Sequence, residues 1–354
     1  MTETLTLRRP DDFHLHLRDG AILSAVVGQS RHFARAIIMP NLVPPLVTAD
    51  MVAAYRGRIE AALPPGADFT PLMTLYLADT TTPEEIDRAA NIITAVKLYP
   101  AHATTNSAAG VTDLSALMPA LERMAERGIL LLIHGEVTDP EVDIFDREAV
   151  FIETVLDPLR QRLPELKIVL EHISSRTGAD YVMGAGDRLA ATITAHHLVI
   201  DRNDLLVGGI RPHNYCLPIV KRADDRKALV AAAISGHPRI FFGSDSAPHT
   251  DPKKLGACGA AGCFTAPVAL SLLATLFEAE GALHQLNAFL GEHGARYYGL
   301  PLNEGTLMLE RHAPEPAAPV ATPDGPIAIF AAPGPLAWRV AEDGAHRSPS
   351  RPRP

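Results

Sequence analysis

Short runs of apolar and β-branched residues recur along the chain, and segments of helical length separate most of them. Such runs are typical of strands that are buried on both faces. The pattern predicts eight strands, at residues 13–17, 34–41, 69–77, 95–99, 129–135, 167–173, 189–198 and 240–244.

The clearest helical segment between these runs covers residues 114–127. Its leucines and methionines recur at spacings of three and four, which places them on one face of a helix. Gly128 follows at the position where a glycine commonly ends a helix. Pro119 indicates that the helix begins no more than about one turn before it.

Eight buried strands that alternate with helices predict an α/β fold, a closed (β/α)8 TIM barrel. The alternative is a doubly wound open sheet, which usually has a glycine-rich phosphate turn after its first strand. In this chain the first predicted strand contains His-Leu-His instead. The pattern therefore favours the barrel.

The barrel is expected to occupy residues 1–300, with residues 265–300 as a further helical layer. After Leu300 the composition shifts to proline and alanine, which predicts a small C-terminal extension at 301–343, packed on the barrel. Within it, residues 325–340 suggest two short strands around a Pro-Gly turn. Residues 344–354 are basic and proline-rich and are expected to form a disordered tail.

Composition narrows the class of protein. The chain has 354 residues, of which 47% are hydrophobic and 21% charged, so a folded core is expected. The net charge of −9 argues against nucleic acid or an anionic membrane as the main partner, although a local cationic site could still bind a small anion. No run is long enough to span a membrane, no signal peptide is recognisable, and three cysteines suit a reducing compartment. We therefore expect a cytoplasmic protein.

The chemistry of a barrel collects at the C-terminal ends of its strands. His14 and His16 lie two residues apart on the first predicted strand and should share a face. Neutral imidazole is a common zinc ligand, but one of the two could equally be an ordinary buried histidine. Further ionisable residues at other predicted strand ends favour the metal: Lys97, His134, His172 and Asp245.

Lys97 stands in an otherwise apolar run. Burial lowers the pKa of a lysine, and a neutral amine can form a Schiff base or add carbon dioxide to become a carbamate. A lysine that extends to the barrel mouth is the plain alternative. The surrounding histidines favour a carbamate that bridges two cations.

Three further features have a plain and a functional interpretation. Asp245 could cap the next helix, or it could bind a metal ion and carry a proton. Arg18 could pair with Asp19 at the surface, or its planar fork could bind a carboxylate on the face of His16. The small polar segment 101–110 could be a connector, or a lid over the site.

The set of strand-end residues is similar to that of the amidohydrolase superfamily with a binuclear metal centre. The segments RRPDDFHLHLRDG, MPNLVPP, KLYPAHATTNSAAGVT, LLIHGEV, EHISS, LVGGIRPHNYCLPI and GSDSAPH together resemble the short, type II class of bacterial dihydroorotases. The resemblance extends to about Leu300. Only thirteen residues precede His14, so we expect no β-sandwich of the kind that longer relatives build from that part.

The resemblance implies a pair of zinc ions. His14, His16 and Asp245 would hold one, and His134 and His172 the other. Lys97, as N6-carboxylysine, would bridge the two together with a hydroxide. Asp245 would also be the catalytic proton carrier.

The resemblance also implies the reversible cyclisation of N-carbamoyl-L-aspartate to L-dihydroorotate and water, in the synthesis of UMP, by a homodimer. The substrate carboxylate would be held by Arg18, Asn41 and His249. The backbones of Leu217 and Ala261 would contact the ring, and Thr104 and Thr105 would belong to a mobile lid loop. Other cyclic-amide hydrolases, acting on hydantoins, dihydropyrimidines or allantoin, are the first alternative. A non-catalytic barrel that serves as a partner of another enzyme is the second.

Two positions depart from the family pattern. Ala260 in CGAAGC stands where a cysteine often does, which argues against a cysteine metal site in that stretch. His102 replaces a more usual asparagine.

Overall fold

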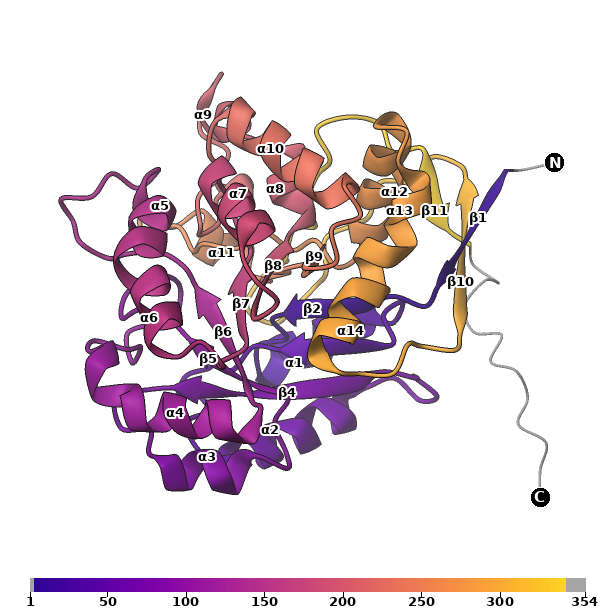
Figure 1. Ribbon diagram of the computed structural model, residues 1–354. Helices are drawn as coiled ribbons and strands as arrows, with labels where there is room; N and C mark the ends of the chain where they lie inside the picture. The colour runs from indigo at the N-terminus through magenta and orange to yellow at the C-terminus, as the bar shows by residue number, and fades with distance from the viewer. Residues whose placement is uncertain (1–2, 342–354) are drawn as a thin grey trace.

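The computed structural model describes residues 3–341, and its centre is a sheet of eight parallel strands hydrogen-bonded in sequence order (Figure 1). The predicted (β/α)8 fold is confirmed; the first strand lies two residues earlier than predicted, and the other seven are shorter. They are β2 (Asp11–Leu15), β3 (Arg35–Ile38), β4 (Thr70–Leu77), β5 (Ala95–Leu98), β6 (Leu130–His134), β7 (Ile168–Glu171), β8 (Leu189–Ile193) and β9 (Ile240–Phe242).

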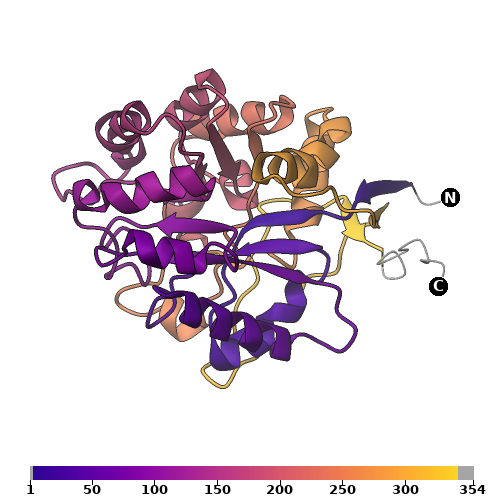
Figure 2. The same ribbon diagram turned by 60° about the horizontal axis from the view of Figure 1, so that its bottom comes forward.

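Helices surround this sheet, as Figures 1 and 2 both show. The α-helices are α1 (Gly20–Val26), α2 (Ala49–Ala62), α3 (Pro83–Ala89), α4 (Met118–Arg127), α5 (Arg147–Phe151), α6 (Asp157–Arg162), α7 (Arg176–Gly184), α8 (Ala195–Val199), α9 (Arg202–Leu206), α10 (Ala223–Ile234), α11 (Asp251–Lys254), α12 (Ala269–Ala279), α13 (Leu283–Asn287) and α14 (His293–Tyr298). Short 3-10 segments are η1 (Val27–Ser30), η2 (Leu114–Leu117) and η4 (Pro212–Asn214), and π-helical turns are η3 (Ile152–Leu156) and η5 (Ala288–Glu292).

The barrel closes where the chain after β9 meets β2. The Asp245 amide donates to the His14 carbonyl at 2.9 Å, and the His16 amide donates to the Ser246 carbonyl at 3.2 Å. Leu15 and Ser246 form an isolated parallel bridge there. These contacts bring the first and last strands together, which an open doubly wound sheet does not do.

Local sequence explains where predicted elements end. The predicted strand 189–198 stops at Ile193, because the Thr194 hydroxyl accepts a hydrogen bond from the His197 amide and begins α8. The predicted helix at 114–127 begins as the 3-10 turn η2 and becomes α4 at Met118, with Pro119 in its first turn. It ends at Gly128, whose φ of 68° only glycine adopts at little cost.

The pairing of β2 with β3 shifts register between Asp12 and Leu15, as at a β-bulge, and this changes the side-chain alternation of β2. Phe13 packs inside the barrel, with its ring centroid 5.1 Å from that of Phe241 and 5.2 Å from that of Tyr298 in α14. Leu15 instead joins the larger core between strands and helices. The bulge therefore combines an apolar barrel floor with the histidines above it.

A second, antiparallel sheet joins both ends of the described chain in the order β1-β10-β11. Its strands are β1 (Thr4–Arg8), β10 (Thr306–Arg311) and β11 (Trp338–Val340), which lie together on one side of the barrel (Figures 1 and 2). The expectation of two strands around a Pro-Gly turn in 325–340 is wrong, because β11 pairs with β10 and Ile327 bridges Val320 instead. The expected disordered tail, 344–354, lies outside the described residues.

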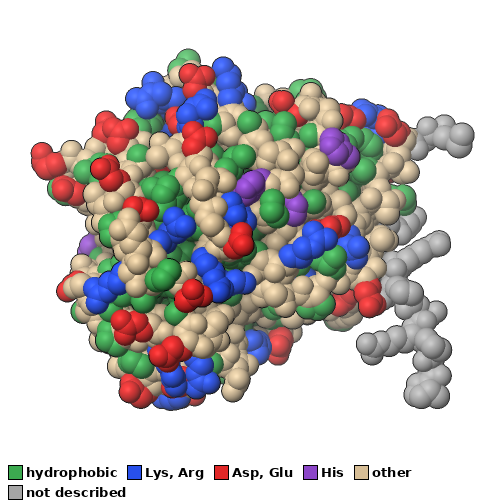
Figure 3. All heavy atoms as spheres, in the orientation of Figure 1, with side chains coloured by type: hydrophobic (Ala, Val, Ile, Leu, Met, Phe, Trp, Pro, Cys, Tyr) green, Lys and Arg blue, Asp and Glu red, His purple; other side chains and the backbone are tan. Residues whose placement is uncertain are grey.

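Charges of both signs are interspersed over the face shown in Figure 3. Among residues 3–341, no helix has the length and apolar character that crossing a membrane requires.

Candidate active site

The C-terminal ends of the barrel strands surround a small, narrow cavity that is lined mainly by polar side chains. Most of the residues singled out from the sequence line it: His14, His16, Arg18, Asn41, Thr104, Thr105, His134, His172, Leu217, Asp245 and Ala261. Of the other two, Lys97 lies fully buried beside it, and His249 lies behind Arg18.

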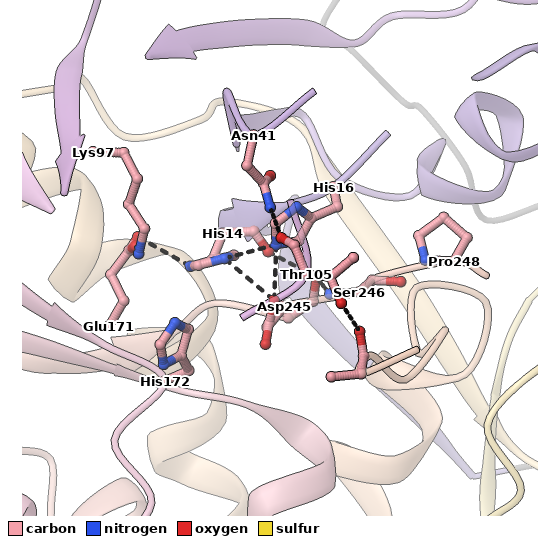
Figure 4. Close-up of polar contacts among 12 residues, drawn as sticks. His14, His16, Asn41, Lys97, Thr105, Glu171, His172, Asp245, Ser246 and Pro248 are labelled. Carbon is pink, nitrogen blue, oxygen red and sulfur yellow. Dashed lines mark hydrogen bonds and ion pairs between the residues drawn. The ribbon is translucent and has the colours of Figure 1, made fainter. Parts of the chain in front are cut away.

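Two imidazoles and one carboxylate converge at the junction of β2 and β9 (Figure 4). The Nε2 atoms of His14 and His16 are 3.2 Å apart, and the Asp245 carboxylate lies 3.3 and 3.0 Å from them. All three side chains are buried. An arrangement of this kind requires a positive charge between its members, supplied either by a proton or by a metal ion.

The pKa values of these three groups are consistent with the need for a positive charge between them. Burial lowers the pKa of His14, but the Glu171 and Asp245 carboxylates raise it more, to about 9. Burial and the Arg18 charge lower the pKa of His16 to about 4. Burial raises the pKa of Asp245, but the two imidazoles hold it well below its usual range. The site therefore favours an anionic Asp245 beside a cation.

His134 and His172 face each other across the ends of β6 and β7, with ring centroids 4.8 Å apart. His134 Nε2 lies 2.8 Å from a carboxylate oxygen of Glu136. His172 Nδ1 is buried and has no hydrogen-bond partner among residues 3–341. Burial keeps the pKa of His172 well below its usual range, so the ring is neutral and can offer a nitrogen lone pair to a metal ion.

Lys97 on β5 is fully buried, and its Nζ contacts the Glu171 carboxylate (Figure 4). The same Nζ lies 4.7 Å from the centroid of the Tyr99 ring. Burial lowers the pKa of Lys97 against the opposing charge of Glu171. Glu171 also reaches His14 Nδ1 at 3.1 Å and so connects the lysine to the first histidine.

These donors fit a metal centre. The ligand atoms of His14, His172 and Asp245 all lie within 4.8 Å of one another, and the three residues are buried. Imidazole nitrogen and carboxylate oxygen are ordinary zinc ligands. The contacts of His14 with Glu171 and of His134 with Glu136 match the carboxylates that commonly orient such histidines from behind.

Arg18 presents a positive charge to the same cavity. Its guanidinium contacts the Pro248 carbonyl at 3.3 Å and His249 Nε2 at 2.9 Å, and the residue is only 9% exposed. No carboxylate among residues 3–341 forms an ion pair with it, so the surface pairing with Asp19 is wrong, and Asp19 binds Arg58 instead. Burial and the Arg18 charge lower the pKa of His249 to about 2, which keeps it neutral. A buried cation without an anion is suited to an anionic ligand.

The loop 101–110 lies over the cavity. The Asn41 side-chain amide donates to the Thr105 carbonyl at 3.1 Å (Figure 4). The Thr105 hydroxyl donates to the Ala261 carbonyl at 3.3 Å. Inside the loop the Ser107 hydroxyl donates to the Thr104 carbonyl at 2.6 Å. These bonds hold the loop against both walls of the cavity.

Backbone strain is concentrated in this region. Among the described residues, five that are not glycine have positive φ: Arg18, His102, Asn106, His172 and Asp245. Each lies at the cavity or in the loop over it. Such conformations cost of the order of 1–3 kcal/mol and tend to persist at functional sites. At His102, φ is 65°, a value that asparagine and histidine both tolerate better than most residues.

Sequence reasoning missed three acidic residues that support the site: Asp12, Glu136 and Glu171. Asp12 accepts hydrogen bonds from the amides of His14 and Ser244 at 3.1 and 2.8 Å and so fixes the barrel closure. Two signals could have revealed the other pair. Glu136 follows His134 at a spacing of two, and Glu171 is a charged residue at the end of the apolar run Ile168–Glu171.

Comparisons with known proteins agree with this geometry. No protein-family model matches the chain. A relative from a Jannaschia species, named dihydroorotase, is 59% identical over 345 residues, which are 96% of this chain and 99% of the relative. The crystal structure of dihydroorotase from Campylobacter jejuni is 38% identical, covers 96% of this chain and 98% of its own, and has a TM-score of 0.88.

The dihydroorotase of Saccharomyces cerevisiae, solved in complex with 5-fluoroorotic acid, is 34% identical with a TM-score of 0.88. It covers 96% of this chain and 98% of its own length. Identity at these levels over nearly the full length of both chains shows that the chain belongs to the dihydroorotase family.

Proposed function

We propose that the chain catalyses the reversible cyclisation of N-carbamoyl-L-aspartate to L-dihydroorotate and water, a step in the synthesis of UMP. The observation that carries the proposal is the buried Arg18, which has no ion-pair partner among the described residues and lies beside a cluster of metal-binding side chains. Both N-carbamoyl-L-aspartate and L-dihydroorotate carry a carboxylate that a planar guanidinium can bind through two hydrogen bonds.

The metal-binding residues are proposed to hold a pair of zinc ions. His14, His16 and Asp245 would hold one, and His134 and His172 the other, with the carbamate of Lys97 between them. The buried Lys97 amine, with its lowered pKa, is suited to carbamate formation. When bound, the zinc pair would polarise the amide carbonyl and lower the pKa of a water molecule.

The chain's own residues would position the substrate and move the proton. Arg18, Asn41 and His249 would bind the carboxylate, and the 2.9 Å contact between His249 and Arg18 would hold those two side chains together. The backbones of Leu217 and Ala261 would contact the ring from the opposite wall. In ring opening, an Asp245 carboxylate oxygen would accept the proton of the attacking water and pass it to the departing ring nitrogen. In ring closure it would begin protonated.

The overall reaction has a fixed proton balance, whichever residues catalyse it. Closure joins a carboxylate and the ureido nitrogen in a neutral ring imide, releases one water molecule and consumes one proton. The equilibrium ratio of dihydroorotate to carbamoyl aspartate should therefore fall about tenfold for each unit increase in pH.

A cyclic-amide hydrolase for substrates without a carboxylate, such as hydantoins or dihydropyrimidines, is the alternative. In such an enzyme the buried charge of Arg18 would have no counterpart in the substrate. The third possibility, a non-catalytic barrel, is disfavoured because all six expected metal-binding positions carry suitable donors.

The test compares wild type with Lys97→Ala, for metal content and for hydrolysis of L-dihydroorotate and of dihydrouracil, which lacks the carboxylate. Wild type should hydrolyse dihydroorotate only, and Lys97→Ala should lose both turnover and metal. The exposed Lys227→Ala is the matched control and should behave as wild type. Equal turnover of dihydrouracil, or full activity in Lys97→Ala, would overturn the proposal.

A further inference from the structure

A second cluster of metal-binding side chains lies outside the proposed active site. His196 in α8, Cys216 and Cys263 place one ligand atom each within 4.8 Å of one another, and all three residues are buried. They come from three separate segments of the chain. Cys258, the other cysteine, is exposed and does not belong to this cluster.

His196 has an unusual environment for a buried histidine. It is 0% exposed, and neither of its ring nitrogens has a hydrogen-bond partner among residues 3–341. Its ring contacts those of His197 and Phe330, with centroids 4.6 and 6.4 Å away. Leaving a buried polar group without a partner costs about 1–3 kcal/mol, and a metal ion bound to one nitrogen would remove much of that cost.

The neighbouring His197 shows the contrast. Its Nδ1 lies 2.8 Å from the Thr194 hydroxyl, and its Nε2 lies 2.9 Å from the Pro218 carbonyl. Its Nε2 is also 3.9 Å from Cys216 Sγ. The same short helix therefore carries one histidine with both nitrogens bound and one with both nitrogens free among the described residues.

We infer that His196, Cys216 and Cys263 form a separate zinc site. Cysteine sulfur and imidazole nitrogen are common ligands of structural zinc, and thiolates select against magnesium and calcium. Binding would release the two thiol protons, so that two thiolates balance the charge of the ion.

The neighbouring Cys263 and burial raise the pKa of the Cys216 thiol, and the charge of Lys254 opposes that shift. Lys254 is 4% exposed, and its Nζ donates to the carbonyls of Tyr215, Ala260 and Gly262 at 2.8, 2.9 and 2.8 Å. Two of these residues directly precede Cys216 and Cys263. Within residues 3–341 no carboxylate forms an ion pair with this ammonium, so it can stabilise negative charge on the adjacent sulfurs.

The cluster lies next to two segments that line the active-site cavity, so a metal ion there would stabilise the cavity wall. Cys216 is adjacent to Leu217, and Cys263 lies two residues after Ala261, and both of these neighbours line the active-site cavity. The Gly262 amide already donates to the Tyr215 carbonyl at 2.9 Å. A zinc ion here would cross-link the two segments to each other and to α8, and so fix the cavity wall from behind.

Alanine at position 260, where a cysteine often stands in the family pattern, is compatible with this metal site. The missing cysteine argued against a site formed by the CGAAGC stretch alone. In the structure only Cys263 of that stretch takes part, and the other sulfur and the imidazole come from distant segments.

The test produces the full chain in medium where cobalt replaces zinc, and records its near-ultraviolet absorption and metal content. A thiolate ligand gives a strong charge-transfer band with cobalt, and the nitrogen and oxygen ligands of the proposed active site do not. We expect the band in wild type and in the control Cys258→Ser. Cys216→Ser and Cys263→Ser should lose the band and one metal ion per chain.

His196→Gln separates ligation from folding, because it retains both sulfurs and a polar group of similar length. It should keep the wild-type fold by circular dichroism and bind the third ion at least tenfold more weakly. Absence of the band in wild type overturns the inference whatever the variants do. So does an unchanged band in Cys216→Ser, or a Cys216–Cys263 disulfide in protein isolated without reductant.

Discussion

Arg18 is held at the cavity by contacts that do not neutralise it. Its partners are the Pro248 carbonyl and two histidines, with His249 at 2.9 Å and His16 at 3.4 Å. Its φ of 59° lies in the left-handed region, which is uncommon for a residue other than glycine. A substrate carboxylate would therefore meet a charge that has already been desolvated and oriented, which reduces the cost of binding.

Replacing Arg18 with lysine should raise KM roughly 10- to 100-fold, because one charge-assisted hydrogen bond of about 1.5–3 kcal/mol is lost. Metal content should be unchanged, since Arg18 is not a proposed ligand. Steady-state kinetics and elemental analysis measure both. Arg58→Lys is the matched control, because Arg58 binds Asp19 with the same two-bond geometry at the surface. Equal KM values in the two variants would contradict the assigned role.

Glu136 would act on the proposed metal centre through its contact with His134. Its carboxylate lies 2.8 Å from His134 Nε2, so Nδ1 remains available to a metal ion. Glu136→Gln should weaken metal binding by roughly 10- to 100-fold, as is typical when such a supporting carboxylate is removed. Competition with a chelator would measure the affinity. The exposed Glu141→Gln should leave it unchanged, and an unaltered affinity in Glu136→Gln would show that His134 does not depend on this contact.

At the scale of elements, the approach of β2 to the chain after β9 leaves no space for a side chain at Gly243. A Cβ there would lie 2.9 Å from the Cβ of His14 and 3.0 Å from that of Thr192. Gly243→Ala should lower the free energy of unfolding by about 1–3 kcal/mol, because two strands must separate. It should also reduce metal content, since His14 moves with β2.

Denaturant unfolding provides the measurement and Gly57→Ala the control. In α2, nothing lies within 4 Å of a Cβ at Gly57, so alanine there should stabilise the protein by about 0.5–1 kcal/mol. If both variants unfolded at the same denaturant concentration, the close approach at Gly243 would not contribute to the free energy of unfolding.

The loop 101–110 is held to the cavity by hydrogen bonds that a substrate could replace. Thr104→Ala combined with Thr105→Ala should lower kcat roughly tenfold, the effect of losing hydrogen bonds worth about 0.5–1.5 kcal/mol each. Metal content should not change. Stopped assays and elemental analysis test this, with the exposed Thr80→Ala as control. Loss of metal in the double variant would mean that these threonines support the centre rather than the lid.

The barrel was predictable because each strand is a short apolar run, and the candidate functional side chains stand at or near the ends of these runs. Lys97, His134 and Asp245 stand at such ends, so the topology alone brings them together. Glu171 was missed because it looks like the polar end of a strand, although it contacts both Lys97 and His14. Its role depends on distances across the barrel that spacing along the chain does not encode.

The second sheet was missed for a related reason. β1 and β10 pair across almost the whole chain, with Thr4 opposite Glu310, and neither contains a turn signal for the other. The local Pro-Gly signal in 325–340 suggested a hairpin instead. The long-range pairing is more favourable than a local hairpin because it buries the side chains of Leu7, Leu309 and Trp338 against the barrel core.

For the whole molecule, this pairing joins the two ends of the described chain to the barrel. Trp338 in β11 is 1% exposed, and Arg311 lies over its ring at 4.9 Å. The Ala337 amide donates to the Thr275 hydroxyl of α12 at 3.0 Å. The described part of the proposed extension, residues 301–341, therefore shares its core with the barrel helices.

A shared core predicts one cooperative unfolding transition. Trp338 is the only tryptophan of the sequence, so its fluorescence reports the small sheet, while far-ultraviolet circular dichroism is dominated by the barrel helices. The two signals should change at the same denaturant concentration. Trp338→Ala should cost about 3–5 kcal/mol and shift the whole dichroism transition, whereas Ile210→Ala, at a residue 72% exposed, should change stability by less than about 0.5 kcal/mol. A fluorescence transition that precedes the dichroism transition would mean that the sheet unfolds alone, and that the barrel does not need it.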